Sequence, residues 1–255
     1  MFNILMSTKY FILSKPKDHF EKPNKSVADN TDNQIIHLND NRLCYILPQN
    51  IMTYYCDKGL FEAQLIEWCK QFCSPEKTFL DIGAHTGTYT LSLSGSSKNI
   101  VSFEPQQMTY YALCGSVALS NLQNVKCLNI GLGSEDQVGK KTLNIVSNDG
   151  GGSSLHVPNG MSILRTEEIV VNTLDSVAKE YNISDIGFIK MDVEDNEFFV
   201  LMGAQETLKA SNYPPILFEC NDREKNKNLF DHLATLGYKV VHVGGVANMY
   251  LACGG

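Results

Sequence analysis

The sequence predicts an α/β fold in which a mostly parallel sheet carries helices on both of its faces. Three observations lead to this prediction. Apolar runs of strand length alternate with segments of helical periodicity through most of the chain, which is typical of parallel strands joined by helices. The first core strand, residues 78–82, runs directly into a turn that contains two glycines. The second core strand, residues 100–103, is followed by an acidic residue, Glu104.

The composition is that of a soluble globular protein. The chain has 255 residues, 43% of them hydrophobic and 19% charged, which is enough for a buried core in one domain with a modest extension. It carries 21 Lys and Arg against 28 Asp and Glu, a formal charge of −7. Because sequence-independent binding to nucleic acid depends on Lys and Arg that neutralise phosphates, we expect no nucleic-acid partner. The composition leaves the oligomeric state open.

Cysteine usage and the length of the apolar runs bear on location. The eight cysteines include no CxxC pair and no short-spaced Cys and His cluster, which argues against a zinc site. A chain of this size can be stable without disulfides, so we expect reduced, buried thiols and a cytoplasmic location. No apolar run approaches the ~20 residues of a membrane span, so we expect no transmembrane segment. Residues 1–13 lack the basic start and the cleavage site of a signal segment, and an N-terminal strand or a loosely ordered tail is expected there.

The first part of the chain differs from the rest. Residues 1–41 are predicted to be a polar N-terminal extension or linker, because 14–41 are rich in Asn, Asp and Lys and have little periodicity. The main domain spans residues 42–255. Its first part, 42–77, is expected to form an N-terminal cap with a strand at 43–47 and a helix at 60–72. Tyr54, Tyr55 and Trp68 in this cap are expected to pack in the core, with the shaping of a ligand pocket as the alternative.

The core elements follow in an alternating order. The expected strands are 78–82, 100–103, 125–130, 186–191, 215–220 and 238–243, and the expected helices are 86–93, 108–119, 197–210 and 224–236. An insertion at 141–173 separates the third and fourth core strands, with strands at 141–146 and 168–172, a loop of glycines and serines at 149–154, and a helix that begins at Asn172 or Thr173. A last run, 247–253, is expected to return as a hairpin onto the edge of the sheet.

The turn after the first core strand has the chemistry of a site for a nucleotide-like ligand. Gly83 and Gly87 allow close approach of the backbone, and the following helix offers free N–H groups. His85 stands where a dinucleotide fingerprint has its second glycine, so NAD and FAD are disfavoured. Asp81, directly before the turn, suits a ligand with an amine or sulfonium group. A purely structural turn is the alternative.

Glu104 ends the second core strand about twenty residues beyond the turn. In Rossmann-like sites a carboxylate at this place accepts both hydroxyl hydrogens of a ribose. The alternative is an ordinary exposed glutamate at a strand end. The register of Glu104 with the preceding turn favours the ribose-binding role.

A series of motifs extends this interpretation. They are DIGAHTGTYT at 81–90, FEP at 103–105, NIGLGS at 129–134, GGSSL at 151–155, VNTLD at 171–175, IKMDVEDNE at 189–197 and LMGA at 201–204. In this order they resemble the FkbM-type family of S-adenosylmethionine-dependent methyltransferases, over about residues 79–220. The resemblance implies a class I methyltransferase Rossmann-like fold, with a seven-stranded, mostly parallel sheet, and S-adenosyl-L-methionine as the cofactor.

The resemblance also implies where the cofactor binds. The implied cofactor-binding residues are Asp81, Gly83, Ala84, His85, Gly87, Glu104, Pro105, Ile130 and Gly131. The turn residues would line the methionine and ribose part, Glu104 would bind the ribose, and Ile130 and Gly131 would lie near the adenine. Two positions depart from the family pattern, which often has Asn where His85 stands and Gly where Asp195 stands. For His85 itself, a structural role is favoured over contact with the ligand.

Carboxylates follow the fourth and fifth core strands, where an acceptor would lie. Asp192 and Glu194 follow residues 186–191, and Glu219 lies near the end of 215–220. Transfer to a hydroxyl benefits from a general base, which is worth about 100- to 10,000-fold. The hypothesis is that Asp192 or Glu194 is the base and that Glu219 orients the acceptor or shares the role. The alternative is that these carboxylates cap the helices that follow.

Two further interpretations concern the same strand ends. Asp192, Glu194, Glu219 and Asn221 offer oxygen ligands suited to Mg²⁺, but nothing in the sequence fixes their spacing, so a required metal is the lesser alternative. Lys190 is expected to form a structural ion pair with Asp192 or Glu194.

The sequence therefore predicts a methyltransferase. As the resemblance implies, we expect O-methylation of a hydroxyl on a sugar, glycan or related small molecule, so the expected partner is a small-molecule or glycan acceptor. The first alternative is an N- or O-methyltransferase of a non-sugar acceptor. The second is a catalytically inactive protein that keeps the cofactor fold as a scaffold or interaction subunit. An NAD-dependent enzyme is the third, which His85 disfavours.

Overall fold

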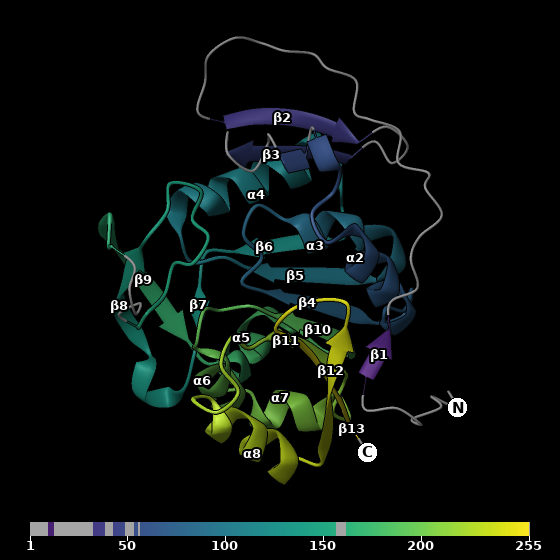
Figure 1. Cartoon of the computed structure of the whole chain (residues 1–255), viewed down its shortest axis with the longest axis vertical. Helices are drawn as coiled ribbons and strands as arrows, with labels where there is room; N and C mark the ends of the chain where they lie inside the picture. The colour runs from purple at the N-terminus through teal and green to yellow at the C-terminus, as the bar shows by residue number, and fades with distance from the viewer. Residues whose placement is uncertain are drawn as a thin grey trace.

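The computed structural model describes residues 10–12, 33–38, 43–48, 54–55, 57–156 and 162–254, and for the first two of these segments it describes the backbone alone. A central sheet of eight strands dominates the molecule (Figure 1). Its strands are, in spatial order, β1 (Tyr10–Ile12), β12 (Tyr238–Gly244), β13 (Met249–Gly254), β11 (Ile216–Glu219), β10 (Ile186–Met191), β4 (Thr78–Ile82), β5 (Asn99–Phe103) and β6 (Val125–Leu128). All neighbours pair in parallel except β13, which is antiparallel to both β11 and β12.

This strand order confirms the predicted class I methyltransferase fold, with β1 added beside β12 as an eighth strand. The expected place of the last strand is wrong, however. β13 does form a hairpin with β12, but it lies between β11 and β12 and not at the sheet edge. Its burial explains this position, because Met249, Leu251 and Ala252 are all buried and a strand that is apolar on both faces belongs in the interior of a sheet.

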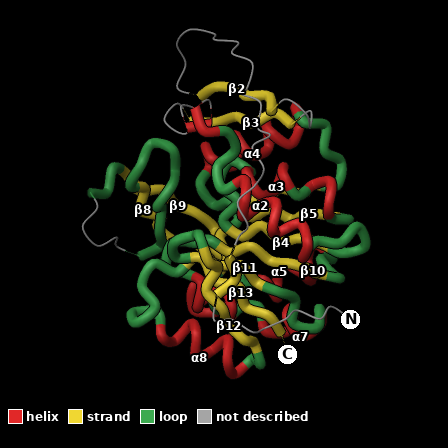
Figure 2. The backbone as a smooth tube through the Cα atoms, turned by 45° about the vertical axis from the view of Figure 1, so that its right-hand side comes forward, coloured by secondary structure: helices red, strands yellow, loops and turns green. Residues whose placement is uncertain are grey.

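Helices cover both faces of the sheet, and Figure 2 shows the strands at the centre with the helices around them. The α-helices with defined bounds in the described part of the chain are α2 (Ala63–Cys69), α3 (Thr88–Ser92), α4 (Gln107–Leu119), α5 (Leu174–Tyr181), α6 (Glu197–Met202), α7 (Gln205–Ala210) and α8 (Lys227–Thr235). Helices α5 to α8 share a core with Leu80 of β4, whereas α2 and α3 share a core with the neighbouring residue Phe79. Successive strand residues face opposite sides of the sheet, so both faces are buried.

The single helix predicted at 197–210 is two helices, α6 and α7. Gly203 follows the last residue of α6, and a Cβ at this position would lie 2.1 Å from the carbonyl oxygen of Gly133. The Gly203 carbonyl accepts a hydrogen bond from the backbone N–H of Asp175 at 2.9 Å. The break is therefore caused by a close tertiary contact that the local sequence does not reveal.

The segment before β4 forms a hairpin and a helix. The strand predicted at 43–47 is confirmed as β3 (Leu43–Pro48), which pairs in antiparallel fashion with β2 (Asn33–Leu38). The sequence did not predict β2, because it lies in the stretch expected to be a polar extension. β3 packs on α4, where the hydroxyls of Ser120 and Ser116 accept hydrogen bonds from the N–H groups of Cys44 and Ile46.

A second, smaller sheet projects beside the core. It consists of β7 (Gly131–Leu132), β9 (Arg165–Asn172) and β8 (Gly139–Ile145). β8 and β9 match the two strands predicted in the insertion, whereas β7 precedes it. The next helix, α5, begins after Thr173, whose hydroxyl accepts a hydrogen bond from the N–H of Ser176. Short 3-10 helices occur at Lys70–Phe72, Ser94–Ser96 and Glu135–Gln137.

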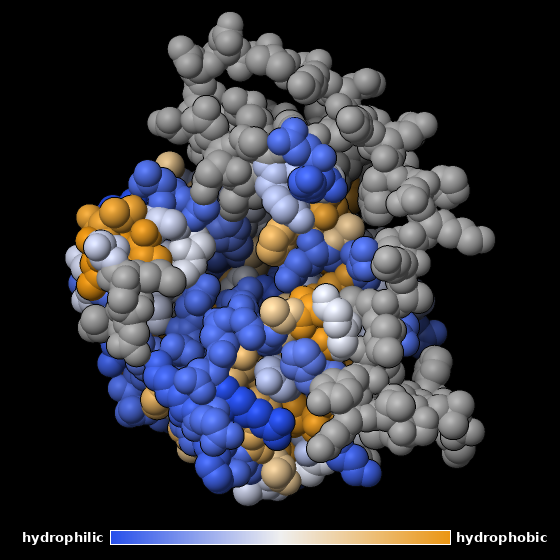
Figure 3. All heavy atoms as spheres, in the orientation of Figure 1, coloured by the Kyte–Doolittle hydropathy of each residue, from blue (hydrophilic) through white to orange (hydrophobic). Residues whose placement is uncertain are grey.

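Among the apolar areas of the surface in Figure 3, one lies over this small sheet. Ile163, Leu164 and Val170 are large apolar side chains of this region that are exposed. Among the helices in the described part of the chain, none is long and apolar enough to cross a membrane.

Candidate active site

A cavity of about 510 Å³ opens at the carboxyl ends of β4, β5 and β10. Its walls are the turn at 82–86, residues 103–105 and 130–132, a glycine-rich loop at 150–153, residues around 190–194, and part of the N-terminal cap. Its volume is within the usual range for ligand sites, roughly 300–1,000 Å³. Open α/β sheets bind their ligands at this end of the strands.

The turn after β4 is shaped by contact with the end of β10. Gly83 has a φ of 77°, and a Cβ on this residue would lie 1.8 Å from the carbonyl oxygen of Asp192. Gly87 has a φ of 96° and packs against the side chains of Leu113 and Leu91. Gly83 lines the cavity, whereas Gly87 is not among the lining residues. At both positions a Cβ would overlap neighbouring atoms, which explains why each residue is glycine.

Glu104 lies at one end of the cavity and is held in a fixed orientation. Its Oε2 accepts a hydrogen bond from the N–H of His85 at 2.9 Å, and its Oε1 accepts one from the N–H of Gln106 at 2.9 Å. Burial raises the pKa of this carboxyl to about 7. Pro105, Ile130 and the backbone of Gly131 form an apolar wall beside it. The spacing from the turn thus predicted a carboxylate that does reach the cavity.

Asp81 lies at the end of β4, outside the cavity lining. It was expected to contact a ligand, but its side chain is fully buried and does not line the cavity. Its Oδ2 accepts a hydrogen bond from Thr90 on α3, and its Oδ1 has no hydrogen-bond partner among the described residues. Burial raises the pKa of this carboxyl. Asp81 therefore supports the turn from beneath, because side chains of a strand alternate between faces and this one points into the protein.

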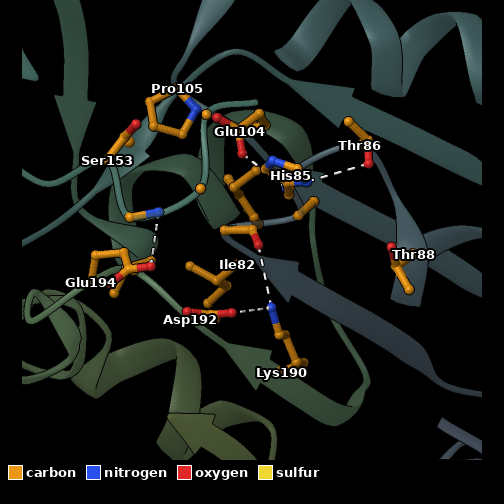
Figure 4. A pocket seen from close by; sticks show the side chains of 18 of the residues that line it. Ile82, His85, Thr86, Thr88, Glu104, Pro105, Ser153, Lys190, Asp192 and Glu194 are labelled. Carbon is orange, nitrogen blue, oxygen red and sulfur yellow. Dashed lines mark hydrogen bonds and ion pairs between the residues drawn. The ribbon is translucent and has the colours of Figure 1, made fainter. Parts of the chain in front are cut away.

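An ion pair stands at the other end of the cavity (Figure 4). Lys190 Nζ lies 3.1 Å from Asp192 Oδ2 and donates a hydrogen bond to the carbonyl oxygen of Gly83 at 3.3 Å. Burial disfavours the ammonium form of Lys190, but the attraction of Asp192 and Asp81 outweighs burial and raises its pKa. The predicted pairing of Lys190 with Asp192 is confirmed. Asp192 remains partly accessible, with 30% of its side chain exposed.

Glu194 and the glycine-rich loop are bound to each other. Glu194 Oε1 accepts a hydrogen bond from the N–H of Gly152 at 3.1 Å, and the Glu194 carbonyl accepts one from the hydroxyl of Ser154 at 2.6 Å. Burial and the charge of Asp192 raise the pKa of Glu194 to about 7. On the opposite side, His85 Nε2 lies 2.7 Å from the carbonyl oxygen of Asp149. The loop is therefore attached to the cavity wall at two places.

Glu219 lies beside this group but outside the cavity lining. Burial, together with the charges of Asp192 and Glu194, raises its pKa to about 7. Asn196 occupies the N-cap position of α6, but its side chain makes no capping hydrogen bond there. The carboxyl of Glu197, in the first turn of α6, accepts a hydrogen bond from the N–H of Val193 at 3.0 Å.

Sequence reasoning missed one wall of the cavity. Tyr54, Phe61 and Glu62 of the N-terminal cap line it, and Tyr89 of α3 joins them. The phenol of Tyr89 donates a hydrogen bond to Glu62 Oε2 at 2.7 Å. Tyr54 and Tyr55, for which a role in a pocket is the alternative from the sequence, both line the cavity, whereas no motif singles out Phe61 or Glu62. Within the residues that the structure describes, no group of three or more His, Cys, Asp or Glu side chains could hold a metal ion.

Comparison with known proteins agrees with this arrangement. The sequence model of the methyltransferase FkbM domain matches residues 81–240, which is well over half of the chain. No curated protein matches the chain in sequence.

The solved structures that resemble the chain have low sequence identity. A precorrin-6y C5,15-methyltransferase from Geobacter metallireducens is 10% identical, with 78% of this chain and 92% of that chain covered and a TM-score of 0.48. A putative rRNA-methylase from Clostridium thermocellum is 10% identical, with 74% and 92% covered and a TM-score of 0.49. TYW2 from P. horikoshii, in complex with MeSAdo, is 14% identical, with 88% and 70% covered and a TM-score of 0.48.

The strand order of the central sheet and the family match define this chain as an S-adenosylmethionine-dependent methyltransferase of class I fold. It belongs to the FkbM methyltransferase family.

Proposed function

We propose that the protein transfers a methyl group to a hydroxyl oxygen of a sugar, glycan or related small molecule. One observation carries the proposal. A single cavity joins a carboxylate held by two backbone N–H groups, Glu104, to an accessible carboxylate paired with a buried lysine, Asp192 with Lys190. A transferase of this kind needs both a cofactor end and an acceptor end in one site.

The residues at the first end fit an adenosyl group. In this proposal Glu104 accepts the ribose hydroxyl hydrogens, and its two N–H donors hold the carboxylate in place for them. Pro105, Ile130 and Gly131 provide the apolar wall for the adenine. Gly83, Ala84 and His85 line the adjoining turn and would contact the methionine part. Asp81 and Gly87 then act by supporting this turn. When bound, S-adenosylmethionine supplies an electrophilic methyl group on a sulfonium.

The second end provides acid–base chemistry. In this proposal Asp192 accepts the proton of the acceptor hydroxyl while the oxygen bonds to the methyl carbon, whose bond to sulfur breaks to leave S-adenosylhomocysteine. Lys190 fixes the carboxylate and compensates its charge in a partly buried place. Glu194 and Glu219 lie close enough to interact with Asp192 and are proposed to orient the acceptor. Most of the remaining acceleration would come from holding the oxygen in line with the methyl group.

The alternatives remain an N- or O-methyltransferase of a non-sugar acceptor and an inactive scaffold. The carboxylates at the acceptor end favour a neutral hydroxylated acceptor over a phosphate-rich one, because like charges repel. The absence of a nucleic-acid partner and the cytoplasmic location stay predictions.

Titration calorimetry tests the cofactor half of the proposal. The purified protein is titrated with S-adenosylmethionine, S-adenosylhomocysteine and NAD, in parallel with Glu104→Ala and a control, Glu168→Ala, whose side chain is exposed on β9. We expect both adenosyl compounds to bind wild type and the control, NAD to bind neither, and Glu104→Ala to lose binding. Absence of binding to wild type would contradict a catalytic role and favour the scaffold.

A further inference from the structure

Two exposed aromatic side chains stand at the cavity wall formed by the N-terminal cap. Tyr54 is 44% exposed and Phe61 is 48% exposed, although both line the cavity. Their ring centroids are 5.5 Å apart and their planes are inclined at 69°. Other aromatic residues of the lining, such as Tyr55, Tyr89 and Phe103, are at most 4% exposed. Exposed apolar surface that is concentrated at a cavity is typical of a ligand contact.

A carboxylate accompanies the aromatic pair. Glu62 follows Phe61 directly, lines the same wall and accepts a hydrogen bond from the phenol of Tyr89 at 2.7 Å. Its backbone has a φ of 53°, a left-handed conformation that is uncommon for a residue other than glycine. Such conformations persist where the surrounding structure holds them, often at ligand sites.

The charges of the acceptor end restrict what it can bind. Glu62, Asp192 and Glu194 line the cavity there, against one cation, Lys190, that is already paired with Asp192. Carboxylates accept hydrogen bonds from hydroxyl groups and repel phosphates. Aromatic faces bind flat apolar surfaces, and the C–H face of a pyranose ring is one. The combination therefore suits a ring that has an apolar face and several hydroxyl groups and no phosphate.

This wall of the cavity comes from a part of the chain outside the family match. The family match begins at residue 81, and Tyr54, Phe61 and Glu62 all precede it. The family match covers Glu104 and Asp192, whereas the wall that faces the acceptor comes from a segment outside it.

We propose that Tyr54 and Phe61 form an aromatic contact surface for the C–H groups of an unphosphorylated pyranose ring of the acceptor, and that Glu62 accepts hydrogen bonds from its hydroxyl groups. This inference rests on the proposed function, because it assigns the acceptor end of the same site. Tyr54, Phe61 and Glu62 thus determine which acceptor binds, and the cofactor end is independent of them.

Saturation-transfer NMR tests whether this aromatic contact surface binds a pyranose ring. The protein is loaded with S-adenosylhomocysteine and mixed with the methyl pyranosides of glucose, galactose, mannose and rhamnose, and with glucose 6-phosphate as the charged comparison. We expect at least one methyl pyranoside to bind through its ring C–H protons, and glucose 6-phosphate to bind more weakly than methyl glucoside.

Substitutions then show whether Tyr54 and Phe61 contact the pyranoside. Tyr54→Ala and Phe61→Ala should each weaken binding of that pyranoside on the order of tenfold, whereas Tyr54→Phe should retain it because the ring remains. Tyr111→Ala is the matched control, since Tyr111 is 57% exposed on α4 and does not line the cavity. Affinity for S-adenosylhomocysteine should be the same in all variants.

Three results would overturn the inference while leaving the methyltransferase proposal intact. They are the absence of any pyranoside signal on the loaded wild-type protein, equal pyranoside binding by wild type and the two alanine variants, and a preference for glucose 6-phosphate. Failure of S-adenosylhomocysteine to load is a different result, because it contradicts the proposed function itself.

Discussion

Lys190 and Asp192 form an ion pair across the end of β10, with Nζ and Oδ2 3.1 Å apart. The lysine side chain is 6% exposed and the aspartate side chain 30%. Lys190 Nζ also lies 5.1 Å from the centre of the Tyr89 ring. One buried cation therefore connects the acceptor end of the cavity with the turn after β4 and with α3.

Replacing this lysine should destabilise the protein strongly. Lys190→Met leaves the buried carboxylate of Asp81 without its nearby cation, so we expect a loss of about 3 kcal/mol in the free energy of unfolding. The matched control is Lys140→Met, which breaks an exposed pair with Glu168 at 2.7 Å and should leave the free energy of unfolding nearly unchanged, because solvent screens such pairs. Urea unfolding followed by circular dichroism measures both. Equal losses would show that Lys190 does not compensate buried charge.

Asp192→Asn should abolish turnover without loss of cofactor binding. If Asp192 is the base, turnover should fall at least about 100-fold, measured as formation of S-adenosylhomocysteine with the pyranoside acceptor. Asp195→Asn is the control, because Asp195 pairs with Lys225 on the surface and does not line the cavity. Unchanged turnover in Asp192→Asn would remove Asp192 from the mechanism and leave Glu194 as the candidate base.

The parts of the fold that could be predicted are those with strong local patterns. β4 and β10 were predicted to the residue, because each is a mostly apolar run that is followed by a turn glycine or a charged residue. β2 could not be predicted, because its stability comes from pairing with β3 and not from its own pattern. The break between α6 and α7 depends on the contact of Gly203 with Gly133, which is distant in sequence.

The sequence could predict those site residues that lie at strand ends and in the turn after β4. Glu104 was found because the spacing from the turn puts it at the same sheet edge as Gly83. The role of Asp81 in cofactor binding stays a prediction, because its side chain is fully buried and lies outside the cavity lining. Phe61 and Glu62 were missed because they lie in a cap that packs against the site from elsewhere in the chain.

Gly83→Ala should disrupt the junction between the β4 turn and β10. A Cβ at Gly83 would lie 1.8 Å from the carbonyl oxygen of Asp192, and φ is 77°. Gly237→Ala is a matched control with a φ of 84° and open space around the added carbon. The control should lose about 1–2 kcal/mol for the left-handed backbone, and Gly83→Ala should lose about 1–3 kcal/mol more for the overlap. Similar thermal unfolding of the two variants would contradict the close contact.

The buried carboxyl of Glu197 should make stability depend on pH. Burial raises its pKa to about 8, so the folded state favours the protonated form. Its stabilising contribution is complete below the ordinary pKa, about 4.5, and is lost as the pH rises through about 8. Glu197→Gln should therefore match wild type at pH 5 and have the higher melting temperature at pH 8.5. The opposite order at pH 8.5 would show that the carboxylate is stabilised in the folded protein.

Cofactor affinity should depend on the protonation of Glu104. Burial raises the pKa of this carboxyl to about 7 in the free site, and only the carboxylate form can accept both ribose hydroxyl hydrogens. Binding therefore lowers the pKa, so affinity for S-adenosylhomocysteine should fall as the pH decreases from 8 to 6, with release of a proton on binding below about pH 7. Calorimetry in buffers of different ionisation enthalpy measures both effects.

A second carboxyl could give the same pH profile, because the pKa of Glu194 is also raised to about 7 at the cavity wall. Glu194→Gln separates the two groups. If Glu104 is responsible, this variant keeps the full pH dependence and the proton release. If the profile becomes flat in Glu194→Gln, the titrating group is Glu194, and the attachment of the glycine-rich loop through the N–H of Gly152, rather than ribose recognition, controls the affinity.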